Sequence, residues 1–178
     1  MGNEEKYYPL RPMQRWLINT HLAGNINSTM MNISKLLKLD QSIDMERLAN
    51  SIYRVLNIYD IFRCRFVLHP ETGEICQKFD GEIDKIFVEH MSDKEFAEKI
   101  KTLKEPYHII GNQLYRIRLI ETPTTKYLYL DFYHAIMDGV AIAILFWHKF
   151  DAFYKGKGGY WNSTELCRIH FGRTENIA

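Results

Sequence analysis

The 178-residue sequence has little of what marks several common protein classes. Its three cysteines, Cys64, Cys76 and Cys167, are an odd number without CxxC spacing or clustered histidines, so neither a disulfide framework nor a zinc site is indicated. An excess of charge of one sign is also lacking, because 23 Lys and Arg residues are balanced by 22 Asp and Glu residues. The resulting net charge of +1 predicts no binding of nucleic acid through a charged surface.

Long apolar runs are missing as well. The longest, residues 140–147, has eight residues, whereas a helix needs about 20 apolar residues to span a bilayer. Residues 1–6 are polar and acidic and lack the apolar centre of a secretory signal. We therefore expect a cytoplasmic protein that does not bind a membrane.

What is present is the composition of a folded domain. Hydrophobic residues make up 46% of the chain and aromatic residues 13%, which is enough for one core of ordinary size. Hydrophobic periodicity weakens after the glycine-rich stretch 155–159. We expect one domain over residues 1–155 and a linker or poorly defined tail over residues 156–178.

Three segments show the hydrophobic spacing of amphipathic helices. The first, residues 12–22, starts with Pro12, which suits a first helical turn. The second covers residues 42–56, and the third follows Ser92 and Glu95, which have the spacing of a capping box. A fourth helix, predicted over residues 140–154, is apolar nearly all round and is expected to be buried on several sides.

Between these helices lie β-rich runs bounded by turn residues. Residues 62–68 and 75–79 alternate in polarity around a turn at residues 69–73, which predicts a hairpin. Further strands are expected at residues 31–39, 86–89, 114–121 and 126–134. The organisation is therefore mixed α/β without internal repeats.

The residues best suited to chemistry lie where the last predicted strand meets the last predicted helix. His134 there can accept a proton from an alcohol, amine or thiol near neutral pH. Asp138 can fix the loop, and Gly139 permits a tight turn and a close backbone approach. The spacing also fits a second interpretation, in which His134 is a hydrogen-bonded core histidine and Asp138 is a helix cap.

Resemblance to a known family supports the first interpretation. Residues 132–139 resemble the HHxxxDG motif of nonribosomal peptide synthetase condensation domains and related chloramphenicol acetyltransferase-like acyltransferases. Residues 9–16 are similar to the family's opening glutamine-containing motif, and residues 60–66 to its Leu-Arg-Thr-x-Phe motif. Residues 114–117 resemble the strand before the active-site strand. The resemblance runs over residues 7–154 and corresponds to the amino-terminal half of a condensation domain.

This resemblance implies a fold and a set of roles. The fold is an α/β (α+β) two-layer sandwich, a chloramphenicol acetyltransferase-like half-domain with a mixed sheet and flanking helices. His134 matches the catalytic histidine, Asp138 the aspartate that orients the loop, Arg63 the arginine that pairs with that aspartate, and Gly139 the motif's glycine. Tyr133 replaces the first histidine of the motif, and its larger phenol would reshape the acceptor channel.

The opening motif departs from the family at two positions, where Arg11 and Met13 replace the usual serine and alanine. Members of the family consist of two halves with the active site between them, and this sequence matches the first half only. The resemblance therefore implies that a carboxy-terminal half-domain, or a homo-oligomer, completes the cleft.

The implied activity is transfer of an acyl or peptidyl group to an amine or alcohol, in nonribosomal peptide or related secondary-metabolite synthesis. The donor would be the phosphopantetheine thioester of an acyl or peptidyl carrier protein, or coenzyme A, with no cofactor bound. Two alternatives remain open. One is a self-assembling acyl-coenzyme A O- or N-acyltransferase, and the other is a non-catalytic interaction module or truncated remnant.

Overall fold

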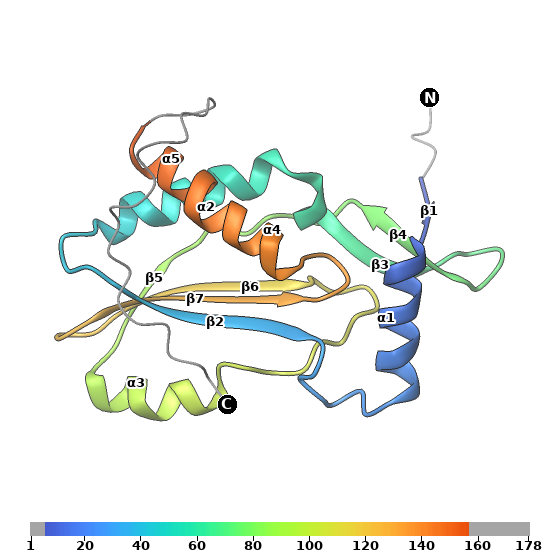
Figure 1. Ribbon diagram of the computed structural model, residues 1–178, viewed down its shortest axis with the longest axis horizontal. Helices are drawn as coiled ribbons and strands as arrows, with labels where there is room; N and C mark the ends of the chain where they lie inside the picture. The colour runs from blue at the N-terminus through green and yellow to red at the C-terminus, as the bar shows by residue number, and fades with distance from the viewer. Residues whose placement is uncertain (1–5, 157–178) are drawn as a thin grey trace.

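The larger of two β-sheets runs through the middle of the computed structural model, which describes residues 6–156 (Figure 1). Its strand order is β2-β7-β6-β5. The strands are β2 (Asn32–Leu39), β7 (Lys126–Tyr133), β6 (Tyr115–Glu121) and β5 (Val88–His90). Neighbouring strands are antiparallel except β5, which runs parallel to β6. The predicted mixed sheet is confirmed.

Helices cover both faces of this sheet (Figure 1). Helix α2 (Met45–Ile58) packs on one face and α3 (Asp93–Lys99) lies against the other. Because successive side chains of a strand point to opposite faces, Leu37 joins the main core while Leu36 joins a second cluster with Phe96. The consecutive apolar residues Leu36 and Leu37 therefore reflect a strand that is buried on both sides.

The second sheet is antiparallel, with the order β1-β4-β3. It contains β1 (Tyr8–Pro9), β3 (Cys64–Leu68) and β4 (Ile75–Phe79). The expected hairpin is confirmed, and Gly73 in its turn has a φ of +68°, which favours glycine. Strand β3 begins at Cys64 rather than at the expected residue 62, because residues Asp60–Arg63 form a 3₁₀ turn.

The first and third helices begin as predicted, whereas the second begins at Met45 rather than at residue 42. Helix α1 (Pro12–Ala23) begins at its proline, and the Asp44 side chain caps α2 by accepting a hydrogen bond from the Arg47 amide. Ser92 and Glu95 form the expected capping box of α3. A 3₁₀ turn, Ile100–Thr102, extends α3.

The last helical segment differs from its prediction. It consists of α4 (Gly139–Ile144), a π-helical stretch, Leu145–Phe150, and α5 (Asp151–Tyr154). Instead of being buried on several sides, it leaves Val140 70% and Ile144 43% exposed. The reason is that it packs along α2 on one side and has no described element over the other (Figure 1).

The described residues contain no helix that is both long and apolar enough to cross a membrane. The predicted domain boundary near residue 155 remains a prediction, because the tail from residue 157 lies outside the described residues.

Candidate active site

The loop after β7 presents two polar side chains on an apolar base. Ala135, Ile136 and Met137 are each at most 8% exposed and anchor the loop in the core, whereas His134 and Asp138 are exposed. The His134 amide joins the loop to the residue just before β2, because it donates to the Met31 carbonyl at 2.8 Å. The interpretation of His134 as a core histidine is therefore wrong.

The His134 ring is oriented by its own loop. Its Nδ1 lies 3.3 Å from the carbonyl oxygen of Met137. A carbonyl oxygen only accepts hydrogen bonds, so Nδ1 carries the proton in this contact. In the neutral ring, Nε2 then holds the lone pair. This is the arrangement a general base needs: one nitrogen is fixed, and the other can receive a proton.

Asp138 caps the helix that follows the loop. Its Oδ1 accepts a 2.7 Å hydrogen bond from the Ala141 amide, and its backbone precedes the first residue of α4. The interpretation of Asp138 as a helix cap is confirmed, and this cap fixes the distal end of the loop.

Arg63 does not pair with Asp138 in the structure. Its guanidinium donates from Nη2 to Asn57 Oδ1 at 2.8 Å and from Nη1 to the Gly81 carbonyl at 3.2 Å. Asp138 is exposed, so its charge is solvated and needs no buried partner. Arg63 instead connects the start of β3 to the segment at Gly81.

Gly139 also differs from its expected role. Its φ is not positive, and no described heavy atom lies within 4 Å of the place a Cβ would occupy. The close approach lies at Gly81 instead, where an added Cβ would be 2.8 Å from the Arg63 carbonyl oxygen. The position that requires a glycine is therefore Gly81, where the backbone packs against the Arg63 carbonyl.

Tyr133 points away from His134's exposed side and into the core. Its ring makes edge contacts with His21, Phe66 and Tyr107, with ring centroids 5.4, 6.3 and 5.7 Å away. Its hydroxyl has no hydrogen-bond partner among residues 6–156, and burial raises the pKa of the phenol. Tyr133 thus acts as packing beneath the loop.

Two polar groups near the loop escaped the sequence reasoning. Gln14 of α1 donates from Nε2 to the Ala135 carbonyl at 3.2 Å. Asp131 of β7 is fully buried and accepts hydrogen bonds from Arg116 at 2.8 Å and Ser34 at 2.9 Å. The sequence did contain one signal for Asp131, because an acidic residue within an apolar strand is expected to have a buried polar partner.

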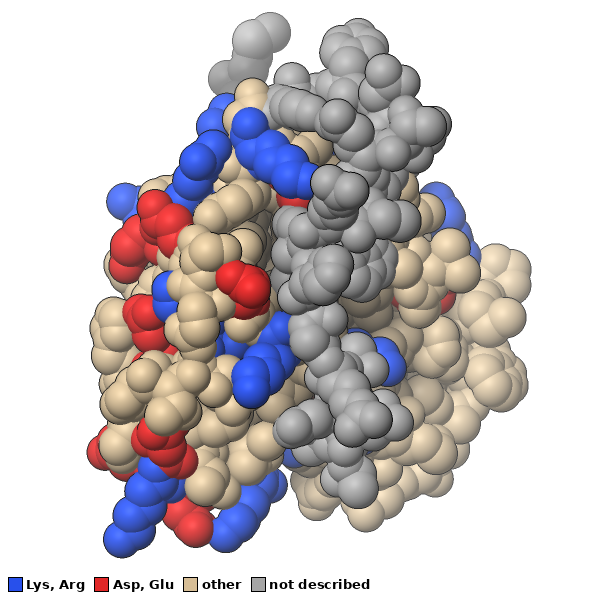
Figure 2. Space-filling view, turned by 60° about the vertical axis from the view of Figure 1, so that its left-hand side comes forward, with Lys and Arg blue, Asp and Glu red and all other residues tan. Residues whose placement is uncertain are grey.

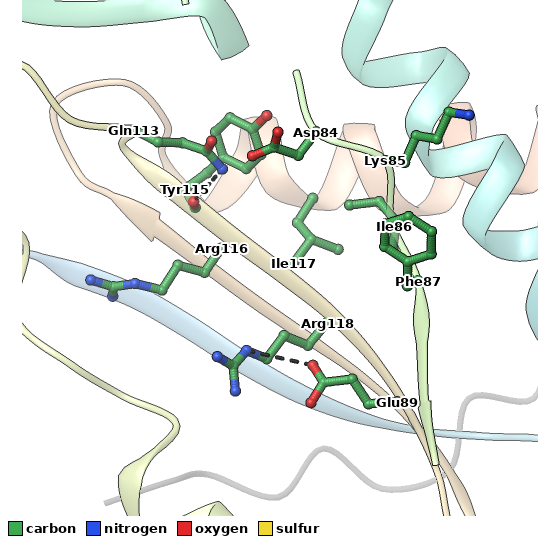
Figure 3. A pocket seen from close by; sticks show the side chains of 10 residues that line it. All are labelled: Asp84, Lys85, Ile86, Phe87, Glu89, Gln113, Tyr115, Arg116, Ile117 and Arg118. Carbon is green, nitrogen blue, oxygen red and sulfur yellow. Dashed lines mark hydrogen bonds and ion pairs between the residues drawn. The ribbon is translucent and has the colours of Figure 1, made fainter. Parts of the chain in front are cut away.

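A groove of about 390 Å³ lies along β6, beside the part of that strand that β5 does not cover (Figure 3). Side chains from residues 84–89 and 113–118 line it, including the Arg118 and Glu89 pair. None of residues 134–138 lines this groove. On the face shown in Figure 2, basic and acidic side chains are interspersed.

The described residues hold no group of three or more His, Cys, Asp or Glu side chains that could bind a metal ion.

Comparison with known families decides where this loop belongs. The family model described as "Condensation domain" matches residues 4–162, which include the His134 loop. The chain belongs to the condensation-domain family. Condensation-domain relatives include surfactin synthase subunit 2 of Bacillus subtilis (strain 168), 28% identical over 169 residues. Bacitracin synthase 1 of Bacillus licheniformis is 28% identical over 156 residues.

Solved condensation domains share the fold. A mutant of the starter condensation domain of the rhizomide synthetase RzmA matches with a TM-score of 0.72 and 15% identity. The condensation domain of the monacolin K polyketide synthase MokA matches with a TM-score of 0.72 and 20% identity. The expected half-domain of the chloramphenicol acetyltransferase-like fold is therefore confirmed.

The condensation-domain match covers only part of each relative. The alignments include 94% and 86% of this chain but only 4% and 3% of the surfactin and bacitracin synthases. In the two solved structures, 88% of this chain matches 40% and 36% of the other. The chain thus corresponds to a fraction of one condensation domain.

Proposed function

We propose that the chain is the amino-terminal part of a condensation-type acyltransferase that acts in nonribosomal peptide or related secondary-metabolite synthesis. The observation that carries this proposal is the exposed His134 ring, whose Nδ1 is held by the Met137 carbonyl. With Nδ1 fixed, Nε2 is available to an incoming nucleophile.

The reaction would be the attack of an amine or alcohol on a thioester carbonyl. A new N–C or O–C bond forms, the C–S bond breaks, and the thiol leaves. His134 Nε2 accepts or orients the proton of the nucleophile, which ends on the departing sulfur. Asp138 acts through the α4 start that it caps, and Tyr133 acts through packing, since its ring is buried.

A solved relative supports a proposal for the donor class. One solved RzmA condensation domain is described as a complex with C8-CoA. For this chain, we propose that the donor is an acyl or peptidyl phosphopantetheine thioester on a carrier protein, or an acyl-coenzyme A. The carrier protein would then be a partner.

A completed site requires a second half. The chain matches about 40% of a solved condensation domain, and several large apolar side chains near α1 are exposed. Met13, Trp16 and Met30 are 66%, 61% and 68% exposed. We propose that a carboxy-terminal half-domain, or another copy of the chain, completes the cleft.

The first measurement is the native mass of the chain by light scattering, followed by an assay of acyl transfer from coenzyme A and carrier thioesters. We expect His134→Ala to lower the transfer rate by about 10²- to 10⁴-fold, which is the usual contribution of general acid–base catalysis. His90→Ala serves as the matched control, because this histidine is exposed at the end of β5.

Equal rates for the two histidine variants would contradict the proposal. A monomer without transfer activity would instead favour the non-catalytic interaction module, whereas an active oligomer would favour the self-assembling acyltransferase.

A further inference from the structure

Two buried amide side chains meet directly behind the His134 loop. Gln14 on α1 is 8% exposed and Gln77 on β4 is 6% exposed. Gln14 Nε2 donates to Gln77 Oε1 at 2.9 Å and to the Ala135 carbonyl at 3.2 Å. Gln77 Nε2 in turn donates to the Pro9 carbonyl at 3.0 Å. One glutamine thus connects the loop to α1 and to the smaller sheet.

The orientation of the Gln14 amide is fixed by a separate bond. Its Oε1 accepts a 2.9 Å hydrogen bond from the amide of Arg11, the residue that precedes the first turn of α1. With the oxygen committed to Arg11, the nitrogen must face Ala135 and Gln77. The start of α1 therefore determines which atom the loop meets.

The carbonyl that Gln14 holds belongs to the residue directly after His134. The same short loop supplies the Met137 carbonyl that orients the His134 ring. Ala135 is 7% exposed, so its carbonyl needs an internal partner. Without this donor, the peptide between Ala135 and Ile136 would keep only the hydrogen bond from the Ile136 amide to the Tyr133 carbonyl at 3.0 Å. The peptide, and with it the Met137 carbonyl that orients the ring, would then be held less firmly.

We propose that Gln14 is a positioning residue for His134, holding the loop in the conformation that keeps Nδ1 on the Met137 carbonyl and Nε2 outward. The functional meaning of this role rests on the proposed function. The effect on the loop conformation does not, and it can be measured without any substrate.

Gln14→Glu separates the two hydrogen-bonding roles of the side chain, as acceptor from the Arg11 amide and as donor to the Ala135 carbonyl. A carboxylate keeps an acceptor for the Arg11 amide, so the cap is retained, but it offers no donor to Ala135. Rotation of Gln77 could restore one contact, whereas the Ala135 carbonyl would still face an acceptor. Gln14→Met is the second variant, because it removes both donors without burying a charge.

Gln41→Glu and Gln41→Met are the matched controls. Gln41 also donates from Nε2 to a backbone carbonyl, that of Thr124 at 2.7 Å, but it is exposed and lies in another part of the molecule. The same chemical changes there should leave His134 unaffected.

The readout is the pair of imidazole ¹⁵N shifts of His134 in the labelled chain, assigned by their loss in His134→Ala. The native chain is expected to show a single neutral tautomer with the proton on Nδ1. Both Gln14 variants should show a mixture of tautomers and faster hydrogen exchange at the Ile136 amide. Folded Gln14 variants with the native tautomer would overturn the proposal, and so would loss of the fold in both.

Kinetics provide the second readout. If the native chain transfers acyl groups, each Gln14 variant should lower kcat by about 10- to 100-fold with little change in KM, because small misplacement of a catalytic group is costly. Unchanged kcat in an active chain would overturn the positioning role. A native chain without any transfer activity would count against the proposed function alone, and the tautomer result would still decide the role of Gln14.

Discussion

Asp131 shows how a charge is accommodated within the larger sheet. Its side chain is fully buried, yet it is bonded to Arg116, Ser34 and Asn32 on neighbouring strands. The Arg116 guanidinium also lies 4.0 Å from the centre of the Tyr107 ring. A buried carboxylate is tolerated when such partners replace its hydration.

We predict that Asp131→Ala lowers the free energy of unfolding by about 3–5 kcal/mol, because it leaves the partly buried Arg116 without its carboxylate. Urea denaturation monitored by circular dichroism would measure this. The control is Asp80→Ala, which removes an ion pair to Lys78 at 2.9 Å from a carboxylate that is 48% exposed. That change should cost about 0–1 kcal/mol, and equal losses in the two variants would refute the distinction.

Individual residues were predicted unevenly. Motif spacing placed His134 and Asp138 together at a strand–helix junction, and the structure agrees. The inward direction of Tyr133 could not be predicted, because it depends on rings from α1, β3 and the segment after α3. One partner of Arg63, the Gly81 carbonyl, was missed for a similar reason, because it lies 18 residues further along the chain. The other, Asn57, is only six residues away, but no residue pattern indicated the contact.

At the level of elements, α4 depends on how its first turn is capped. The Asp138 side chain satisfies the Ala141 amide, one of the donors that a helix start leaves unpaired.

We predict that Asp138→Ala costs about 1 kcal/mol of unfolding free energy, whereas Asp138→Asn costs only a few tenths, because asparagine is an equally good cap. Thermal unfolding of the three proteins would test this. If an ion pair with Arg63 contributed instead, the asparagine variant would lose as much stability as the alanine variant.

Most elements were predictable to within one or two residues because hydrophobic period and capping residues act locally. The capping box of α3 and the hairpin of β3 and β4 are examples. The 3₁₀ turn before β3 and the π-helical stretch after α4 were not predicted. Both segments contact α2, and such tertiary contacts are not encoded in the local hydrophobic pattern.

At the scale of the whole molecule, one buried histidine links stability to pH. His21 is 5% exposed, and burial lowers its pKa below the ordinary value of 6.5, with nearby His108 acting in the same direction and a hydrogen bond to the Ile26 backbone opposing it. Below about pH 6.5 the unfolded chain therefore binds a proton that the folded chain does not.

We predict that the free energy of unfolding falls as the pH is lowered from about 6.5, until the folded-state pKa of His21 is reached. Urea midpoints measured between about pH 5 and pH 8 would show this slope. His21→Gln should flatten it, whereas His90→Gln, at an exposed position, should not. A slope that persists in His21→Gln would assign it to other groups.

The pairing of β2 with β7 sets a condition on how the chain folds. Asn32 lies opposite Tyr133, so more than half of the described chain separates the two strands. During synthesis, β2 leaves the ribosome long before β7 is made. Leu36 and Leu37 therefore stay exposed to solvent until β7 can pair with β2. Such long-range pairing makes folding slow and leaves unpaired strand edges open to other chains. The loop that carries His134 is therefore expected to be among the last parts to form, because it follows β7, the last strand of the sheet in chain order.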